Sequence, residues 1–176
     1  MVTIDLITGF LGSGKTTFLK KYAEYLMNQG LHIGILENDF GAINVDMLML
    51  HELRGDQCEL EMIAGGCDAE SHRRRFRTKL ISMRMCGYDR VLVEPSGIYD
   101  VDEFFDVLRE EPLDQWYEIG NVITILDARL EDNLSEQADY LLASEAANAG
   151  KVILSHADAA TREQCEDTVT HLNRAL

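Results

Sequence analysis

Residues 9–17 of this 176-residue chain read GFLGSGKTT. The stretch follows an apolar run at residues 2–8 and precedes a helical pattern, so it connects an expected buried strand to an expected helix. Its spacing, G-x-x-x-x-G-K-T, is that of a phosphate-binding P-loop. Gly9, Gly12 and Gly14 have no side chain to keep backbone N–H groups away from phosphate oxygens. The stretch therefore predicts a nucleotide-binding site.

The polar residues of this loop have separate expected roles. Lys15 can reach the β- and γ-phosphates of a nucleotide, and the Thr16 hydroxyl can bind Mg²⁺. Lys15 is also a candidate catalytic residue, because its charge would stabilise the transferring phosphoryl group. The positive end of the following helix favours a bound anion. The expected nucleotide-binding residues of the loop are Gly9, Gly12, Ser13, Gly14, Lys15, Thr16 and Thr17.

The composition indicates one globular domain over residues 1–176. The chain is 46% hydrophobic and 27% charged, which is typical of a soluble protein. Its 31 acidic and 16 basic residues give a net charge of −15, which would repel nucleic acid and anionic membrane surfaces. No apolar run approaches the roughly 20 residues of a membrane span, and no signal-like segment begins the chain. We therefore expect a cytoplasmic protein that contacts neither nucleic acid nor membrane.

Cysteines and charges are distributed unevenly. The cysteines are scattered without a C-x-x-C pair, so reduced thiols are expected rather than disulfides. Six of the 16 basic residues lie within residues 73–84, whereas residues 100–118 hold eight acids and one base. Two solvated helix faces, a docking surface or a set of phosphate-binding arginines would each produce this charge pattern.

Strand and helix patterns alternate along the chain. Apolar runs that fit buried strands lie at residues 2–8, 32–37, 58–63, 90–94, 121–127 and 151–155. Helical spacing of apolar residues marks 18–26, 76–83, 101–108, 138–142 and 165–176, and a short helix is expected within 47–53. This order predicts an α/β P-loop NTPase fold, a three-layer sandwich with a mostly parallel central sheet and helices on both faces.

A second candidate motif ends the fourth expected strand, where residues 90–97 read RVLVEPSG. Glu94 follows buried apolar residues and could hold Mg²⁺ or its waters, or orient the attacking water. Gly97 could offer an unhindered N–H to the γ-phosphate. Glu94 and Gly97 therefore join Lys15 as candidate catalytic residues.

A third candidate motif, ENDFG at residues 37–41, follows the second expected strand. Asp39 or Glu37 could complete the Mg²⁺ shell, because this ion prefers carboxylate, hydroxyl, phosphate and water oxygens. An Asx turn formed by Asn38 or Asp39 is the structural alternative. The expected Mg²⁺ ligands are Thr16, Asp39 and Glu94.

The last expected strand runs into SHAD at residues 155–158, where a GTPase carries N-K-x-D. Asp158 could accept hydrogen bonds from guanine, and Ser155 could assist it. Ser155 is shorter than Asn, and His156 replaces a Lys whose aliphatic stem would cover the base, so guanine selectivity could be weakened. A helix-initiating Asp is the structural alternative for Asp158.

Together these motifs resemble the GTPase domain of the CobW-like metallochaperone GTPases. GFLGSGKTT, ENDFG, GGC, VEPSG and SHAD occur in the order found in that family. The resemblance implies Mg²⁺-dependent GTP hydrolysis coupled to the delivery or sensing of Zn²⁺ or Co²⁺. It also implies a metalloprotein client and nucleotide-dependent homodimers.

Two departures from the family pattern bear on these expectations. The family usually carries C-x-C-C after the glycines, whereas residues 65–70 read GGCDAE and keep only Cys67. Cys67 and Glu37 are the candidate Zn²⁺ ligands, with Asp68, Glu70 and His72 nearby. The chain also ends after the last expected helix, so we expect the family's final strand and C-terminal domain to be absent.

Two alternatives remain open from the sequence. An ATP-dependent small-molecule kinase would use Arg73, Arg74, Arg75 and Arg77 as a lid over the phosphates. An adaptor would use nucleotide only to set its shape, without metal chaperone activity.

Overall fold

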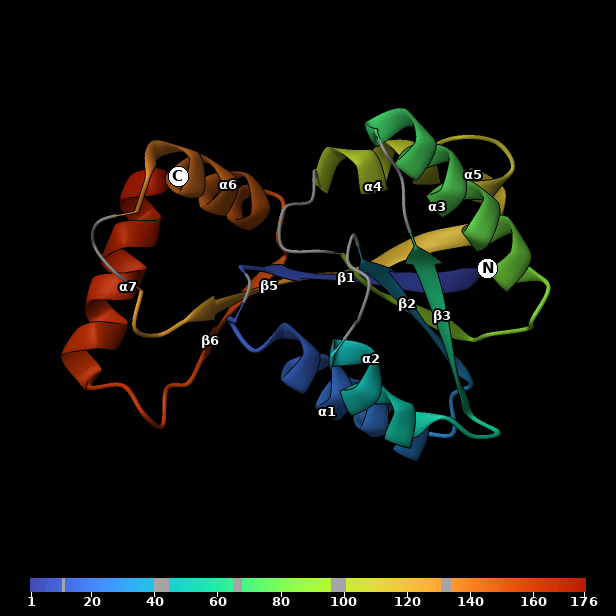
Figure 1. The fold of residues 1–176 in the computed structure, drawn as a ribbon, viewed down its shortest axis with the longest axis horizontal. Coiled ribbons are helices and arrows are strands. Elements are labelled where there is room, and N and C mark those ends of the chain that lie inside the picture. The colour runs from blue at the N-terminus through green and yellow to red at the C-terminus, as the bar shows by residue number, and fades with distance from the viewer. Residues whose placement is uncertain (11, 40–44, 65–67, 96–100, 131–133) are drawn as a thin grey trace.

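A parallel sheet of six strands forms the centre of the molecule (Figure 1). The computed structural model describes residues 1–10, 12–39, 45–64, 68–95, 101–130 and 134–176. The strand order is β3-β2-β4-β1-β5-β6, and every neighbouring pair runs parallel. The strands are β1 Val2–Gly9, β2 Ile33–Asp39, β3 Cys58–Ala64, β4 Arg90–Glu94, β5 Tyr117–Asp127 and β6 Lys151–Ser155.

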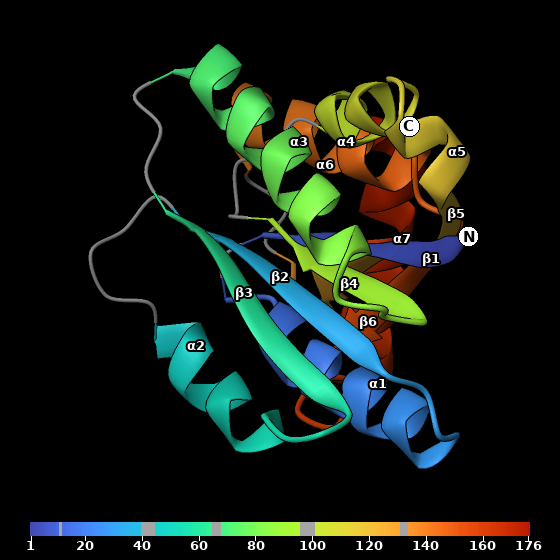
Figure 2. The ribbon, with the colours of Figure 1, turned by 90° about the vertical axis from the view of Figure 1, so that its right-hand side faces the viewer.

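Helices cover both faces of the sheet, as the alternating pattern predicts. α1 and α2 lie on one face, and α3, α4 and α5 lie on the other (Figures 1 and 2). The helices are α1 Lys15–Asn28, α2 Val45–Leu50, α3 Ala69–Arg84, α4 Val101–Leu108, α5 Leu113–Trp116, α6 Glu136–Ala147 and α7 Arg162–Ala175, with a 3₁₀ turn at His51–Leu53. These features confirm the expected three-layer α/β fold.

Three apolar clusters hold these layers together. The largest packs α3, α4 and α5 against the sheet, and the second packs α1 and α2 against the opposite face. The third is smaller and joins β5 to the last two helices through Leu126, Leu142, Ala146 and Leu172. In Figure 1 α6, β6 and α7 accordingly lie to one side of the main body.

Local signals in the sequence account for several helix ends. Gly30 adopts a positive φ of 82° just after α1, and Gly87 does the same after α3 with a φ of 77°. Thr161 and Gln164 form a capping box at the start of α7. Asp68 caps α3 by accepting a hydrogen bond of 2.8 Å from the backbone N–H of Ser71.

Some expectations for individual elements were wrong. β5 begins four residues before the expected strand, and α5 was not expected at all. Tyr25 and Val169 fit the apolar spacing of their helices but are 59% and 44% exposed. Each lies at the border of its helix's apolar stripe, where spacing does not distinguish core from surface.

A buried carboxylate connects β1 to its neighbours. The Asp5 side chain is fully buried and accepts two hydrogen bonds from the Arg90 guanidinium of β4, at 2.6 and 2.9 Å. It also accepts hydrogen bonds from the Tyr22 hydroxyl of α1 at 2.9 Å and the Asn121 backbone N–H of β5 at 2.6 Å. One carboxylate thus bonds three different elements to the central strand.

None of the helices that the structure describes is long and apolar enough to cross a membrane.

Replacing Asp5 should destabilise the fold strongly. Asp5→Ala leaves Arg90, Tyr22 and the Asn121 N–H without their acceptor, and losing one partner of a buried ion pair costs about 3–5 kcal/mol. Urea unfolding followed by circular dichroism would measure the loss. Glu52→Ala, which breaks the exposed Lys20–Glu52 pair of 2.6 Å, is the control and should cost much less. Equal losses of unfolding free energy in the two variants would contradict the stabilising role given to Asp5.

Candidate functional site

The expected P-loop connects the carboxyl end of β1 to α1. Gly14 precedes α1 with a φ of 88°, a left-handed conformation that favours glycine. Gly9 has a φ of 140°, and a Cβ atom there would clash with the carbonyl oxygen of Ile125 on β5. The loop therefore requires glycine at both positions for reasons of backbone geometry alone.

Lys15 begins α1 and is buried, with 8% of its surface exposed. Its Nζ donates a hydrogen bond of 2.8 Å to the carbonyl oxygen of Gly9. The side chain therefore folds back along the loop and brings its ammonium to the end of β1. The positive ends of the first α1 N–H groups lie at this same junction. The arrangement concentrates positive charge where the sheet meets its first helix.

Thr16, the residue after Lys15, forms a buried pair with Glu94. The Thr16 hydroxyl donates a hydrogen bond of 2.9 Å to Oε1 of Glu94, which ends β4. Adjacent oxygens in an octahedral Mg²⁺ shell are also about 2.9 Å apart, since each Mg–O bond is about 2.0–2.1 Å. The spacing and chemistry of these two oxygens therefore fit a shared Mg²⁺ ion.

Glu37 lies beside this pair. It is 3% exposed and is the register partner of Glu94 in the pairing of β2 with β4. Parallel strands place these two acids at the same edge of the sheet, as the sequence predicts. The structure thus brings Lys15, Thr16, Glu37 and Glu94 to one edge.

Three expected site residues cannot be located in this way. Gly97 and Cys67 lie outside the described residues. Asp39 is the last residue of β2, so its backbone reaches the same edge of the sheet, but its side chain is outside the description.

The SHAD segment, at the end of β6, contacts the backbone of the loop. Ser155 Oγ lies within hydrogen-bonding reach of the backbone oxygen of Ser13 and, at 3.3 Å, of that of Leu126, and its single proton is shared between these two acceptors. A Cβ atom on Gly14 would lie 3.8 Å from Cε1 of His156. Asp158 is exposed. Ser155 therefore bonds the P-loop backbone, while Asp158 keeps its carboxylate open to solvent.

His156 is held by a residue that was not expected at the site. Its Nδ1 lies 2.9 Å from Oδ2 of Asp127 at the end of β5, and Arg129 pairs with the same carboxylate at 3.2 Å. Burial raises the pKa of Asp127, but hydrogen bonds from Arg129 and His156 outweigh it and hold the pKa below its usual value. A hollow of about 220 Å³ lies between the loop and the end of β5, lined in part by Ser13, Asp127 and Arg129.

The basic segment of α3 contacts acids instead of the loop. Arg73 and Arg77 both pair with Glu110, at 2.6 and 3.0 Å, and Arg77 also donates to the carbonyl oxygen of Glu111 at 2.8 Å. Lys79 pairs with Glu61 at 2.6 Å. The basic and acidic segments thus pair with each other within the molecule, which none of the three readings of this charge pattern foresaw. These contacts do not support a lid formed by Arg73 and Arg77.

Residues near Cys67 in sequence have other partners. Asp68 caps α3, and its bonds to Ser71 lower the pKa of its carboxyl. Glu70 pairs with Arg74 at 3.3 Å, and His72 Nδ1 lies 2.7 Å from Glu103. Within the part of the chain that the structure describes, no three His, Cys, Asp or Glu side chains are grouped to hold a metal ion.

Two residues near the loop were missed by sequence reasoning. Asp127 ends a buried strand, as Glu37 and Glu94 do, so the same signal could have identified it. Glu145 is a buried acid in the interior of α6 with 3% exposure. Its helix neighbours Leu142 and Ala146 are apolar and buried, but an acid beside them is expected to reach solvent, so sequence reasoning did not select Glu145.

Comparisons with known proteins identify a family for this chain. The model of the CobW/HypB/UreG nucleotide-binding domain matches residues 3–176. The zinc chaperone YjiA of Escherichia coli K12 is 27% identical over 98% of this chain and 55% of its own length. The zinc chaperone YeiR of the same organism is 27% identical over 93% of this chain and 49% of its own length.

Solved structures show the same fold at low identity. Zn(II)-bound YjiA GTPase from E. coli has a TM-score of 0.59 and 22% identity over 97% of this chain and 54% of its own. FtsY from Mycoplasma mycoides has a TM-score of 0.65 and 18% identity over 98% of this chain and 57% of its own.

The chain spans about half the length of the curated relatives that it matches. The family match nevertheless covers nearly all of its residues, including every element that forms the loop and its surroundings. The chain belongs to the CobW/HypB/UreG nucleotide-binding domain family.

Proposed function

We propose that this chain binds GTP with Mg²⁺ and hydrolyses it slowly, and that hydrolysis is coupled to delivering or sensing a transition metal, most simply Zn²⁺. The observation that carries the proposal is the buried Thr16–Glu94 pair at 2.9 Å beside the Lys15 loop. Family membership supports nucleotide binding. The cytoplasmic location expected from the sequence belongs to the same proposal.

The residues of the loop would divide the work of holding the nucleotide. The N–H groups of the loop and of the first turn of α1 would bind phosphate oxygens, and Lys15 would turn from the Gly9 carbonyl to the β- and γ-phosphates. Asp158 would accept hydrogen bonds from the guanine ring, while Ser155 keeps the loop in place through the Ser13 carbonyl. In this proposal Ser155 acts through the loop and does not contact the base.

Thr16 and Glu94 would hold Mg²⁺, and Glu37 or Asp39 would complete the shell directly or through water. Bound there, Mg²⁺ would neutralise the charge that develops on the phosphoryl group. Glu94 would orient water at the ion, and Gly97 would donate its N–H to the γ-phosphate. The segments that carry Asp39 and Gly97 would change arrangement when the γ-phosphate leaves.

The metal function rests on the relatives and on Cys67. Proteins described as zinc chaperones match 93–98% of this chain. Cys67 and Glu37 are the proposed Zn²⁺ ligands, with Co²⁺ as the second candidate ion. A metalloprotein client and a homodimer that forms with nucleotide complete the proposal. The kinase alternative lacks a supporting contact, because Arg73 and Arg77 are paired with Glu110.

Removing the Lys15 ammonium should weaken GTP binding. Lys15→Ala loses a charged hydrogen bond to phosphate, which is worth about 1.5–3 kcal/mol, so affinity should fall roughly ten- to a hundredfold. Displacement of a fluorescent GTP analogue would measure it, with GTP expected to compete better than ATP. Lys21→Ala, an exposed position on α1, should bind as the parent does. Unchanged affinity in Lys15→Ala would refute the phosphate site.

Removing the Thr16 hydroxyl should raise the Mg²⁺ requirement. Thr16→Val keeps the shape of the side chain but removes an oxygen ligand, so half-maximal GTP turnover should need several times more Mg²⁺. Phosphate release at varied Mg²⁺ concentrations is the measurement. Thr170→Val, an exposed position on α7, serves as the control. An identical Mg²⁺ dependence in both variants would argue against the shared ion.

Cys67 should be needed for Zn²⁺ uptake. Cys67→Ser replaces a soft thiolate with a poor zinc ligand, so stoichiometric Zn²⁺ binding should be lost while GTP binding remains. Equilibrium dialysis with metal analysis would count the bound ions. Cys86→Ser, at an exposed cysteine just after the carboxyl end of α3, is the matched control. Retained Zn²⁺ in Cys67→Ser would remove this thiol from the proposed site.

A further inference from the structure

Glu145 is a buried acid that the proposed reaction does not use. It lies on α6 with 3% of its surface exposed. Its Oε2 is buried and has no hydrogen-bond partner among the residues that the structure describes. Burying a carboxylate without full compensation is costly, so such a group needs a structural or functional reason.

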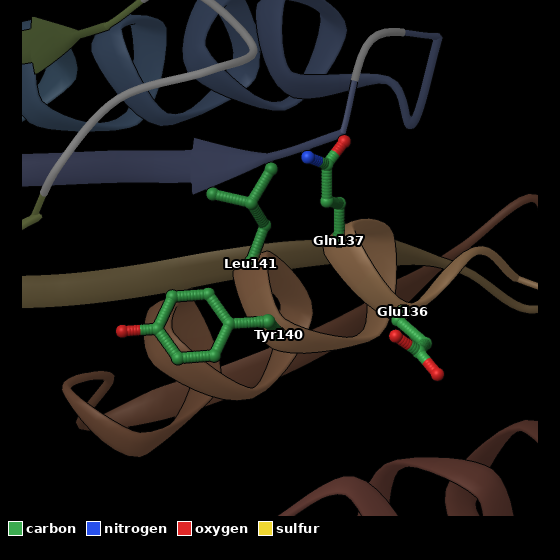
Figure 3. A pocket seen from close by; sticks show the side chains of 4 residues that line it. All are labelled: Glu136, Gln137, Tyr140 and Leu141. Carbon is green, nitrogen blue, oxygen red and sulfur yellow. The ribbon is translucent and has the colours of Figure 1, made fainter.

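The face of α6 that carries Glu145 is turned toward the P-loop strand. Figure 3 shows Gln137 and Leu141 pointing toward β1 and the loop after it, whereas Glu136 and Tyr140 point elsewhere. Gln137, Leu141 and Glu145 are spaced four residues apart, so they share one helix face. α6 also contacts β1 directly.

A chain of hydrogen bonds connects Glu145 to the base of the loop. The Thr124 hydroxyl of β5 donates to the backbone oxygen of Glu145 at 3.2 Å. The same hydroxyl lies 2.8 Å from the Thr8 hydroxyl of β1. Thr8 precedes Gly9, whose carbonyl accepts the Lys15 ammonium. The backbone of Glu145 is thus linked through two hydroxyls to the residue before Gly9, at the end of β1 where the loop begins.

Two opposing influences act on the carboxyl of Glu145. Burial raises its pKa and the positive charge of Lys15 lowers it, and the net result is a pKa of about 7. Among the described residues, Lys15 is the charged group that shifts the pKa of Glu145. From α7, His171 faces a different part of α6, where it lies 2.7 Å from Asp139. β1 and β5 contribute the neutral hydroxyls of Thr8 and Thr124.

We infer that Glu145 is a positioning residue for Lys15: it balances the ammonium in the absence of nucleotide and takes up one proton from solvent when phosphates bind. This inference rests on the proposed nucleotide site. Phosphate oxygens attract the ammonium and bring negative charge near the carboxylate. Both effects favour the neutral acid, so binding and protonation of Glu145 are coupled.

The sign of the coupling sets the pH dependence. A group whose pKa is higher in the complex makes binding weaken as pH rises above the pKa of the free protein. Affinity should therefore fall above pH about 7, by up to about tenfold per pH unit. Below about pH 6 the carboxyl is already protonated, and the dependence on Glu145 should disappear.

Calorimetric titration with a non-hydrolysable GTP analogue and Mg²⁺ tests the inference. Measuring in two buffers of different ionisation enthalpy gives the number of protons taken up per nucleotide. At about pH 8 the parent should take up about one proton more than Glu145→Gln, and at about pH 6 the difference should nearly vanish. Glu145→Gln should also bind more tightly than the parent at the higher pH. Glu136→Gln, an exposed acid on the same helix, should behave as the parent does.

Each outcome has a definite meaning. If nucleotide binds and Glu145→Gln takes up as many protons as the parent, the inference fails while the proposed function stands. If neither the parent nor Glu145→Gln binds nucleotide, the proposed function fails, and the inference that rests on it fails with it. Should Glu145→Gln not fold, the infrared difference spectrum of the parent decides. A protonated-carboxyl band that appears on nucleotide binding at about pH 8, and is absent at about pH 6, supports the inference, and its absence at both overturns it.

Discussion

Asp5 and the four groups that donate to it hold the central strand in place. The carboxylate bonds β4 through Arg90, α1 through Tyr22 and β5 through Asn121. These contacts lie midway along β1, whereas the P-loop lies at its carboxyl end. The register of β1 with β4 and β5 is fixed, so it determines the positions of Gly9, where β1 ends, and of Lys15, where α1 begins. The network therefore aligns the loop with Glu94 without touching either.

Parallel pairing explains why the polar groups meet at one edge. Glu37 and Glu94 are register partners, and Asp127 ends the strand on the other side of β1. Lys15 supplies the buried positive charge at this edge, between acids that burial would otherwise penalise. The result is a concentration of carboxylates around one ammonium and one helix start. This balance between negative and positive charges changes readily when a polyanion or a divalent ion binds.

Sequence reasoning predicted the fold and the loop because both depend on local patterns. Apolar runs, helix-ending glycines and the spacing of Gly9, Gly14 and Lys15 are readable without tertiary information. Ser155 bonds the Ser13 carbonyl and His156 bonds Asp127, and these contacts depend on how two distant segments meet. Glu145 was missed for the same reason, since only packing against β1 and β5 distinguishes it from a surface acid. The roles of Gly97 and Cys67 remain predictions from the sequence.

The small cluster of Leu126, Leu142, Ala146 and Leu172 has a consequence for how the protein loosens. Leu154 of β6 packs against it, and so does Phe10 at the start of the loop, whereas β1 and α1 on either side of the loop contribute to the two larger clusters. Regions with fewer buried contacts open locally at lower free energy than the rest of a domain. On warming, the part that would discriminate between purine bases should fray while the phosphate cradle stays folded. The ability to discriminate between guanine and adenine would then be lost at a lower temperature than the affinity for the triphosphate.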